Sequence, residues 1–466
     1  MDNTPTVSSA EDKLDFKKIL PVFVIVLIDL LGLTIIIPLM PLYAVSFGAG
    51  EFTIGLLGAA YPVMQFIGAP LLGRLSDRFG RKPVLILSQL GTFTGFIILG
   101  LAGSLPLLFI ARIIDGLSGA NISTAQAVIT DNTNEKTRTQ GLGLIGAAFG
   151  LGFIIGPIIA FVSLALGGNN YHVPAFVAAG FSALSILLTW FWLPESLPAE
   201  KRAELAARRQ GQAAGALSIR GMINALGRPG IGILLVLMAA QQIAFGGFEQ
   251  FLSLFTLNRL GMNARDNSGL FVFVGIIVVA VQGYFVGRWS RRLGERRLIY
   301  LGLAALAASL ILTSLTPRQP VAWYSQSRLA QELSGGGMRA HENPTTQSIA
   351  IPLPPDTHTG WLGLAWLVVA VIPAGIGGGI LQPAINSLLT KRSEPDEVGG
   401  ILGLSASFLS GANAVAPLIM GGLFQVFGST APFLAGGILL AVLFVLSLQF
   451  IKPGREEVLS AGLARG

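Results

Sequence analysis

The sequence GRLSDRFGRKPVL at residues 73–85 separates two long apolar runs, residues 53–72 and residues 83–105. Each run is long enough to cross a bilayer as a helix, which takes about 20 residues. Five charged residues lie between the runs: Arg74, Asp77, Arg78, Arg81 and Lys82. They mark a very short turn at a membrane face, and their positive excess predicts that this face is cytoplasmic.

A loop this short between two buried helices must turn tightly, and Gly73 and Gly80 allow close approach of the backbone. Asp77 can accept backbone N–H groups at a helix N-terminus, while Arg78 and Arg81 supply hydrogen-bond donors. On charge alone, a solvated positive-inside loop explains these residues. A loop with a role in function is the alternative.

The composition is that of a membrane protein. Of 466 residues, 52% are hydrophobic and only 12% are charged, whereas soluble proteins average about 25% charged residues. The formal charge of +7 is spread between the apolar runs, which argues against a nucleic-acid partner. The chain has no cysteine, so it has no thiolate metal site, and its three histidines fall in scattered loops. We expect neither a metal nor a cofactor.

Twelve apolar runs of bilayer-spanning length follow one another along the chain. The first run is too long for the apolar region of a signal peptide, so we expect it to be retained. With the N-terminus inside, 25 of the 31 Lys and Arg residues lie in cytoplasmic segments and 5 in external ones. We therefore expect both termini to be cytoplasmic, in a bacterial inner membrane. The runs cover residues 19–43, 53–73, 83–104, 105–129, 141–165, 174–193, 229–257, 266–287, 297–316, 359–389, 400–426 and 430–451.

The chain divides into two halves that repeat each other. Residues 1–193 and 229–466 each hold six runs, and the polar residues 194–228 form a linker between them. Residues 287–296 align with residues 73–82 and keep both glycines, although Arg291 replaces Asp77 and Glu295 replaces Arg81. This pattern predicts an all-α membrane protein whose twelve helices form two pseudo-symmetric six-helix bundles. The second half carries an insertion, residues 317–358, which we expect to be a mobile or locally ordered external loop.

Charged residues at membrane depth are costly, so each is a candidate for function. Asp29 lies in the first run and is either a carboxylate bonded to a neighbouring helix or a proton carrier. Arg112 and Asp115 in the fourth run are three residues apart on one helical face. They either neutralise each other, or Arg112 pairs with Asp29 in one state of the protein. Glu249 lies in the outer half of the seventh run, at depth or at the external water boundary.

Residues 73–82 match every specified position of the pattern G-x-L-x-D-R-x-G-R-K/R, and in this the chain resembles the major facilitator superfamily. The resemblance implies that the loop between helices 2 and 3 latches the outward-open state, and that Asp131 pairs with the arginines of this loop. IARIIDGLSGA at residues 110–120 resembles the pattern R-x-x-Q-G of the fourth helix, whose arginine is associated with proton coupling. Asp115 replaces the glutamine here. The latch residues implied by the resemblance are Gly73, Asp77, Arg78, Gly80, Arg81, Lys82 and Asp131.

In the fifth run, Gly143, Gly152, Gly156 and Pro157 fit the antiporter pattern G-x8-G-x3-G-P-x2-G-G, although other residues replace its final glycines. Ordinary close helix packing is the alternative explanation. Together with LIDLLGLTIIIPLMPLY, LPESLP and LGERR, this makes the chain similar to the drug:proton antiporter branch that includes tetracycline exporters. Helices 3 and 9 lack the acidic residues of those exporters, which argues against tetracycline as the substrate.

We expect uncharged polar and aromatic residues to line a cavity between the halves, although many of them will form interhelical hydrogen bonds instead. The leading hypothesis is proton-coupled export of a small amphipathic compound, with protons, this compound and the bilayer as partners. A nutrient importer or uniporter and a non-transporting receptor on the same fold are the alternatives, and an enzyme is not expected. The candidate cavity residues are Tyr61, Gln65, Asn121, Gln126, Gln241, Gln242, Phe245, Phe248, Gln282, Gln382, Asn386 and Asn413.

Overall fold

A computed structural model describes residues 15–119, 121–134, 137–200, 202, 224–228, 230–335, 350–393 and 397–451. Within these ranges the regular structure is helical, and one isolated bridge joins Val321 to Gly360. Among the described residues, twelve helices are long and apolar enough to cross a membrane, which confirms the number of spans predicted from the sequence. The chain is therefore an integral, multi-pass membrane protein.

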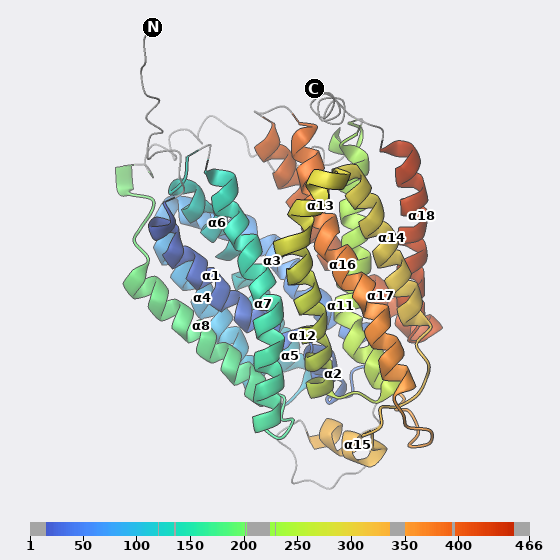
Figure 1. The fold of residues 1–466 in the computed structure, drawn as a ribbon. Helices are drawn as coiled ribbons and strands as arrows, with labels where there is room; N and C mark the ends of the chain where they lie inside the picture. Colours follow the sequence, from blue (N-terminus) through green and yellow to red (C-terminus); the bar gives the residue numbers. More distant parts are fainter. Residues whose placement is uncertain are drawn as a thin grey trace.

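The helices form two bundles that lie side by side (Figure 1). The fourth span is divided into α5 and α6, and the eighth into α12, the π-helix η2 and α13. The N-terminal bundle contains α1 (Phe16–Ile36), α2 (Met40–Val45), α3 (Glu51–Phe79), α4 (Arg81–Gly100), α5 (Leu105–Ser118), α6 (Asn121–Asp131), α7 (Arg138–Leu166) and α8 (His172–Trp192). The C-terminal bundle contains α11 (Gly232–Leu260), α12 (Ala264–Ala280), η2 (Val281–Phe285), α13 (Val286–Leu293), α14 (Glu295–Ser314), α15 (Gln326–Gly335), α16 (Leu362–Lys391), α17 (Val398–Phe427) and α18 (Ala431–Phe450).

Equivalent glycines make the equivalent turns of the two bundles. Gly80 separates α3 from α4 with a φ of 104°, and Gly294 separates α13 from α14 with a φ of 78°. Residues with a side chain rarely adopt these angles. Gly80 and Gly294 are thus required by the backbone conformation of the turn. The prediction that Gly73 takes part in the turn is wrong, because Gly73 lies inside α3 and its equivalent Gly287 lies inside α13.

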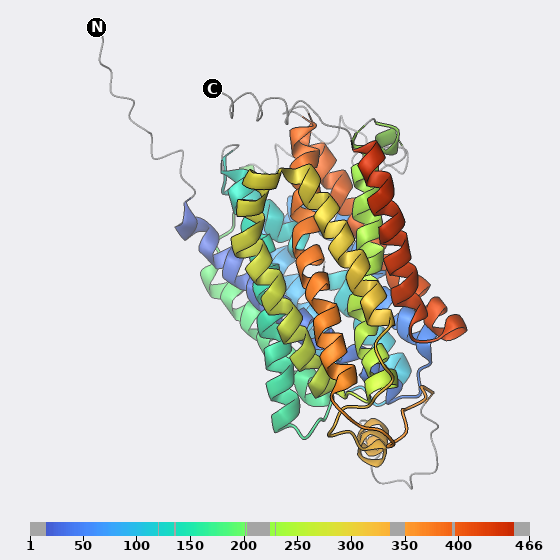
Figure 2. The same cartoon turned by 45° about the vertical axis from the view of Figure 1, so that its right-hand side comes forward.

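The two ends of the molecule differ. We call the end at which α1 begins and α18 ends the termini end, and the opposite end, which α15 covers, the α15 end (Figure 2). Near the α15 end, α3 packs against α17, and a Cβ atom added at Gly55 would lie 2.5 Å from the carbonyl oxygen of Pro417. Ser253 on α11 also donates a hydrogen bond of 2.8 Å to the carbonyl of Pro38 between α1 and α2. The bundles are therefore in tight contact at the α15 end.

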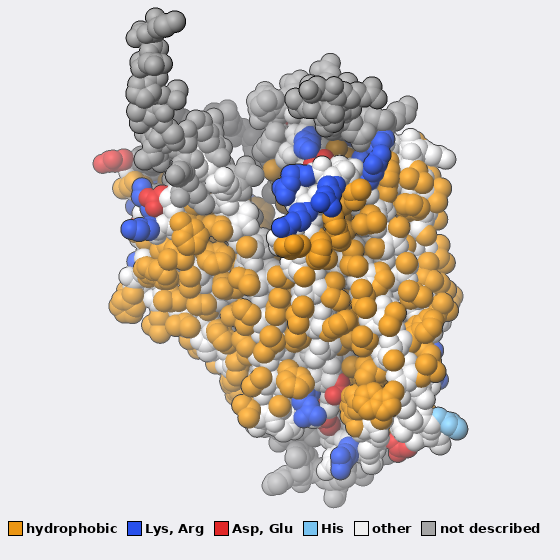
Figure 3. All heavy atoms as spheres, in the orientation of Figure 1, with side chains coloured by type: hydrophobic (Ala, Val, Ile, Leu, Met, Phe, Trp, Pro, Cys, Tyr) orange, Lys and Arg blue, Asp and Glu red, His pale blue; other side chains and the backbone are white. Residues whose placement is uncertain are grey.

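The contact between α7 and α12 loosens toward the termini end. A Cβ atom added at Gly275 would lie 2.6 Å from the carbonyl of Phe153, and one at Gly150 would lie 3.6 Å from Val279. On the same helical face of α7, one and two turns further along, Gly146 and Gly143 have nothing within 4 Å of the added atom. Figure 3 shows the surface hollowed between the bundles at this end. The structure is closed at the α15 end and open at the termini end.

Candidate functional site

Ionisable side chains gather inside the N-terminal bundle, where α1, α3 and α5 meet. Arg112 and Asp115 lie three residues apart on α5, and Arg112 Nη1 is 3.0 Å from Asp115 Oδ2. Both side chains are buried, with 9% and 5% of their surface exposed. The guanidinium also lies over the ring of Tyr61 on α3, 4.5 Å from its centroid, a cation–π contact that is stronger when water is excluded.

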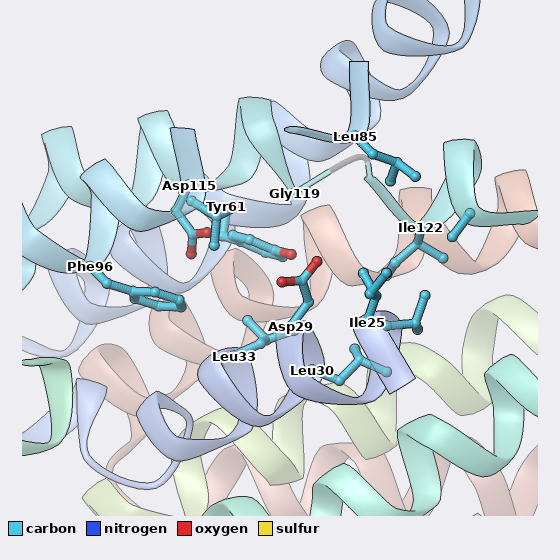
Figure 4. A pocket seen from close by; sticks show the side chains of 13 residues that line it. Ile25, Asp29, Leu30, Leu33, Tyr61, Leu85, Phe96, Asp115, Gly119 and Ile122 are labelled. Atoms are coloured by element: carbon cyan, nitrogen blue, oxygen red, sulfur yellow. The ribbon is translucent and has the colours of Figure 1, made fainter. Parts of the chain in front are cut away.

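Asp29 on α1 faces the same group of residues across a small cavity. Figure 4 shows the Asp29 and Asp115 carboxylates on different sides of the Tyr61 side chain. Asp29, Tyr61 and Asp115 all line this cavity of about 20 Å³, which is enough for one water molecule. The structure therefore brings together three of the four charged residues that the sequence placed at membrane depth.

Two glutamine side chains extend this cluster, and the sequence analysis predicted only one of them as a site residue. Gln65, expected at the central cavity, donates to the hydroxyl of Tyr61 (3.3 Å) and to the carbonyl of Gly119 (2.9 Å) within the N-terminal bundle. Gln89 on α4 was not predicted, and it donates to Asp29 Oδ2 at 3.4 Å and to the hydroxyl of Ser185 at 2.8 Å. An uncharged amide in an apolar run is a sequence signal that would have included Gln89.

The cluster contains more acidic than basic side chains. Two carboxylates, Asp29 and Asp115, accompany one guanidinium, Arg112, so the cluster carries one net negative charge when all three groups are ionised. Charged groups are costly away from water unless they are paired, and each of the two carboxylates is a group to which a proton can bind.

The glycines of the antiporter pattern lie beside the helix that carries Asp29. A Cβ atom added at Gly156 would lie 2.1 Å from Oγ1 of Thr34, and one at Gly152 would lie 3.5 Å from Leu30. Both neighbours are on α1, within about one and a half turns of Asp29. Close packing of α7 on α1 thus depends on Gly156, whereas a side chain at residue 152 would make an ordinary contact. Gly143 lies outside this contact, with nothing within 4 Å.

Arg81, the first residue of α4, joins α3 to α6 through its side chain. Its Nη1 is 2.6 Å from Asp77 Oδ1 and 2.8 Å from the hydroxyl of Ser76, and its Nε is 3.0 Å from Asp131 Oδ2 at the end of α6. Only 8% of the Arg81 side chain is exposed. The geometry brings together the charged residues that the resemblance associated with a latch, and that role remains a prediction.

A different carboxylate occupies the start of α4. Glu195, after α8, accepts the backbone N–H groups of Arg81 (2.9 Å) and Lys82 (3.2 Å), an interaction that the sequence analysis considered for Asp77. Lys82 also donates to the carbonyl of Trp190 at 2.7 Å. Arg78 instead lies over the ring of Phe79, 5.2 Å from its centroid. The LPESLP segment therefore holds the loop in place through Glu195.

The repeated loop of the C-terminal bundle contains the same arrangement with the charges reversed. Glu295 occupies the position of Arg81, and it accepts from Lys391 Nζ at 2.5 Å, at the end of α16. It also accepts from Ser290 at 3.0 Å, which is equivalent to Ser76. An ion pair between the start of a helix and the end of a neighbouring helix is thus present in both bundles with opposite polarity, and it is more exposed in the C-terminal bundle, where 45% of the Lys391 side chain is exposed.

The polar residues expected at the central cavity have separate environments. Gln242 on α11 donates to Asn413 on α17 at 2.7 Å, and Phe245 and Phe248 stack with centroids 6.1 Å apart. Glu249 lies on the same helix, and its Oε1 is buried without a hydrogen-bond partner among the described residues. For the other candidates, Gln241 is buried, Asn386 accepts from Ser405, Gln382 is half-buried, Gln126 and Gln282 are exposed, and the side chain of Asn121 lies outside the described structure.

Twelve spanning helices in two bundles, with ionisable groups at membrane depth, define a transporter rather than an enzyme. The Major Facilitator Superfamily model matches residues 22–360 and 358–463, and the chain belongs to this family. It is 27% identical over 401 residues to tetracycline resistance protein, class B, of Escherichia coli, covering 85% of this chain and 86% of that protein.

A human protein is related at a similar level. The chain is 27% identical over 472 residues to major facilitator superfamily domain-containing protein 10 of Homo sapiens, covering 91% of each. The crystal structure of the human organic anion transporter MFSD10 (TETRAN) superposes with a TM-score of 0.61 at 23% identity, covering 92% of this chain and 99% of that chain. The second likeness supports the fold alone.

Proposed function

We propose that the protein exports a small amphipathic compound in exchange for protons, by alternating access between its two bundles. The observation that carries this proposal is the buried cluster of Asp29, Arg112 and Asp115. One proton changes its net charge between negative and neutral, which is the property that a proton-coupled site requires. The tetracycline resistance proteins among the relatives favour export of a drug-like compound.

The open and closed ends fit one state of such a cycle. The charge distribution predicts that the termini end faces the cytoplasm, so the conformation is inward-facing under this proposal. The state open to the other side would then require α3 to separate from α17, and α7 from α12, at the α15 end. A membrane potential of about 100 mV contributes roughly 2.3 kcal/mol per charge moved, which is a sufficient driving force for concentrative export.

Transport of an organic anion is the second candidate, because the human relative is named as an organic anion transporter. A positively charged side chain in the transport pathway would be needed to attract an anion, and Arg112 is the membrane-depth arginine of the described structure. It is already paired with Asp115. We therefore place anion transport second.

Everted membrane vesicles with an acid interior provide the test. A panel of cationic, neutral and anionic amphipathic compounds is added while the pH gradient is followed, with wild type, Asp29→Asn and Asp15→Asn compared. Asp15 is an exposed carboxylate directly before α1 and serves as the matched control. We expect compound-dependent proton release in wild type and Asp15→Asn but not in Asp29→Asn. Undiminished release in Asp29→Asn would rule out Asp29 as the proton carrier.

A further inference from the structure

Residues 317–335 and 350–358, which we call the α15 arm, are attached firmly to the C-terminal bundle. The N–H of Val321 donates to the carbonyl of Leu260 at 3.0 Å, and Asn258 donates to the carbonyl of Pro352 at 3.0 Å. Tyr324 packs so closely on Gly261 that an added Cβ atom would lie 2.2 Å from its ring. Since these contacts involve the end of α11, the arm must move with the C-terminal bundle as one body.

The far side of the arm contacts the N-terminal bundle. Leu329 and Leu333 on α15 are buried, and α15 packs against α2 across the end of the molecule (Figure 1). Between these two leucines lies Glu332, which accepts hydrogen bonds from the hydroxyl of Tyr171 (3.0 Å) and from Nδ2 of Asn169 (3.0 Å). Both donors belong to the segment between α7 and α8. The hydrogen bonds to this one carboxylate therefore connect the C-terminal bundle to the N-terminal bundle.

A third donor comes from the C-terminal bundle itself. Asn263, the N-cap of α12, donates to Glu332 Oε2 at 3.2 Å. We propose that Glu332 is a latch that holds the two bundles together at the α15 end and must be released whenever the transporter opens there. The latch is built from the insertion that distinguishes the second half of the chain from the first.

The two donors in the N-terminal bundle are also held by contacts within that bundle. Asn169 has a φ of 63°, an angle that asparagine tolerates better than most residues, and its N–H donates to the carbonyl of Leu164 at 2.8 Å. Tyr171 is fully buried, with its ring edge against Tyr43 at 5.7 Å between centroids. Because these contacts restrict the conformations of both donor side chains, little conformational entropy is lost when they bind Glu332.

Opening at the α15 end would break the two hydrogen bonds that cross between the bundles. A hydrogen bond to a charged group contributes about 1.5 kcal/mol or more, so losing two of them shifts an equilibrium by roughly a hundredfold or more. Glu332→Ala should therefore raise the ratio of the form open at the α15 end to the closed form by about a hundredfold. Tyr171→Phe, which removes one donor from the opposite side, should raise this ratio less, by about tenfold.

The latch also has a pH dependence of defined sign. Burial raises the pKa of Glu332 above its usual range, the negative charge of Asp266 adds to this rise, and the hydrogen bonds from Tyr171, Asn263 and Asn169 oppose it. Opening returns the carboxyl to water and to its usual pKa. Glu332 therefore binds its proton more tightly in the closed form, so acid favours closure, and closure weakens as the pH rises through the raised pKa.

The other titratable and charged groups near Glu332 do not change the expected sign of the pH dependence. From α2, the titratable group is Tyr43, whose hydroxyl is 2.9 Å from His172 Nδ1 rather than being bonded to Glu332. On α15 itself, Arg328 lies one turn before Glu332 and is exposed, where its charge is screened by solvent. Glu332→Gln, which cannot ionise, should abolish the pH dependence of closure at this end.

The test measures conformation, so its outcome is independent of the transported compound. The chain has no cysteine, so Gly103→Cys and Ser429→Cys place two spin labels at the α15 end, one on each bundle, with no other reactive thiol. Pulsed electron paramagnetic resonance then gives the distance distribution in the intact protein. Gln331→Ala, an exposed neighbour on the same helix, is the matched control.

We expect a larger long-distance population in Glu332→Ala and Tyr171→Phe than in Gln331→Ala. The double variant should equal Glu332→Ala alone, because Tyr171 acts through Glu332. If Glu332→Ala is unstable, Tyr171→Phe still tests the idea, since it removes a single hydroxyl. A distance distribution in both single variants that matches Gln331→Ala would overturn the proposal.

Discussion

The contact between Gly55 and Pro417 offers a direct way to shift the conformational equilibrium. A Cβ atom at residue 55 would lie 2.5 Å from the carbonyl oxygen of Pro417 and 3.3 Å from Cα of Gly421. Both neighbours are backbone atoms of α17, which cannot rotate away as a side chain would. In Gly55→Ala, α3 and α17 must therefore separate by about 0.5–0.9 Å to reach the 3.0–3.4 Å of tight real contacts.

Overpacking of this kind costs about 1–3 kcal/mol. The cost falls on the conformation closed at the α15 end, because the two helices belong to different bundles and part when this end opens. A difference of this size changes the ratio of the two conformations by roughly 5-fold to 150-fold. Gly55→Ala should therefore move the protein toward the form that is open at the α15 end and closed at the termini end.

The control for this prediction is Gly180→Ala on α8, an exposed residue away from the interface between the bundles. Its new methyl group meets nothing within 4 Å, and both substitutions change the intrinsic helix propensity by about the same amount. The labels at residues 103 and 429 report on the α15 end in either background. Gly55→Ala should lengthen the measured distance and Gly180→Ala should not. If Gly55→Ala lowers the thermal stability but leaves the distance distribution unchanged, closure of this end does not depend on the α3–α17 contact.

Two further predictions concern the second bundle. Glu295→Lys and Lys391→Glu should each slow transport by up to about fivefold, a modest effect because 45% of the Lys391 side chain is exposed. The double exchange should recover most of the rate in vesicles, and no recovery would show that the pair acts separately. Gln242→Leu should weaken the apparent substrate affinity by about tenfold, since it leaves Asn413 without its partner in the proposed cavity. A lower maximal rate with unchanged affinity would instead assign the pair to helix packing.

The sequence predicted the fold well because each element is encoded locally. Hydrophobic length identifies a spanning helix without reference to its neighbours, and the two positive-φ glycines, Gly80 and Gly294, preserve the repeat even where the charges differ. Arg112 and Asp115 were likewise paired by helical spacing alone. Features that depend on residues close together in the chain can therefore be predicted from a single sequence.

Contacts between distant helices were less accessible. Gln89 reaches Asp29 across 60 residues, and Lys391 reaches Glu295 across 96. The sequence showed Glu295 in place of Arg81 and Arg291 in place of Asp77, but only the structure shows that the partner at the end of a neighbouring helix has changed sign as well, from Asp131 to Lys391. Glu332 was not singled out at all, because it lies in a polar insertion where one acidic residue resembles any other. Only the tertiary packing of α15 brings Glu332 within hydrogen-bond distance of residues from both bundles.

The packing of α7 links the buried cluster of the N-terminal bundle to the other bundle. One face of α7 packs on α1 at Gly156, where an added Cβ atom would lie 2.1 Å from Oγ1 of Thr34. Another face contacts α12 of the C-terminal bundle, where the carbonyl of Phe153 meets Gly275. Because Gly156 has no side chain to absorb a displacement, a shift of α1 is passed on to α7. Under the proposed function, a proton bound near Asp29 therefore acts on the opposite bundle through α7, which gives Gly156 a physical role in coupling.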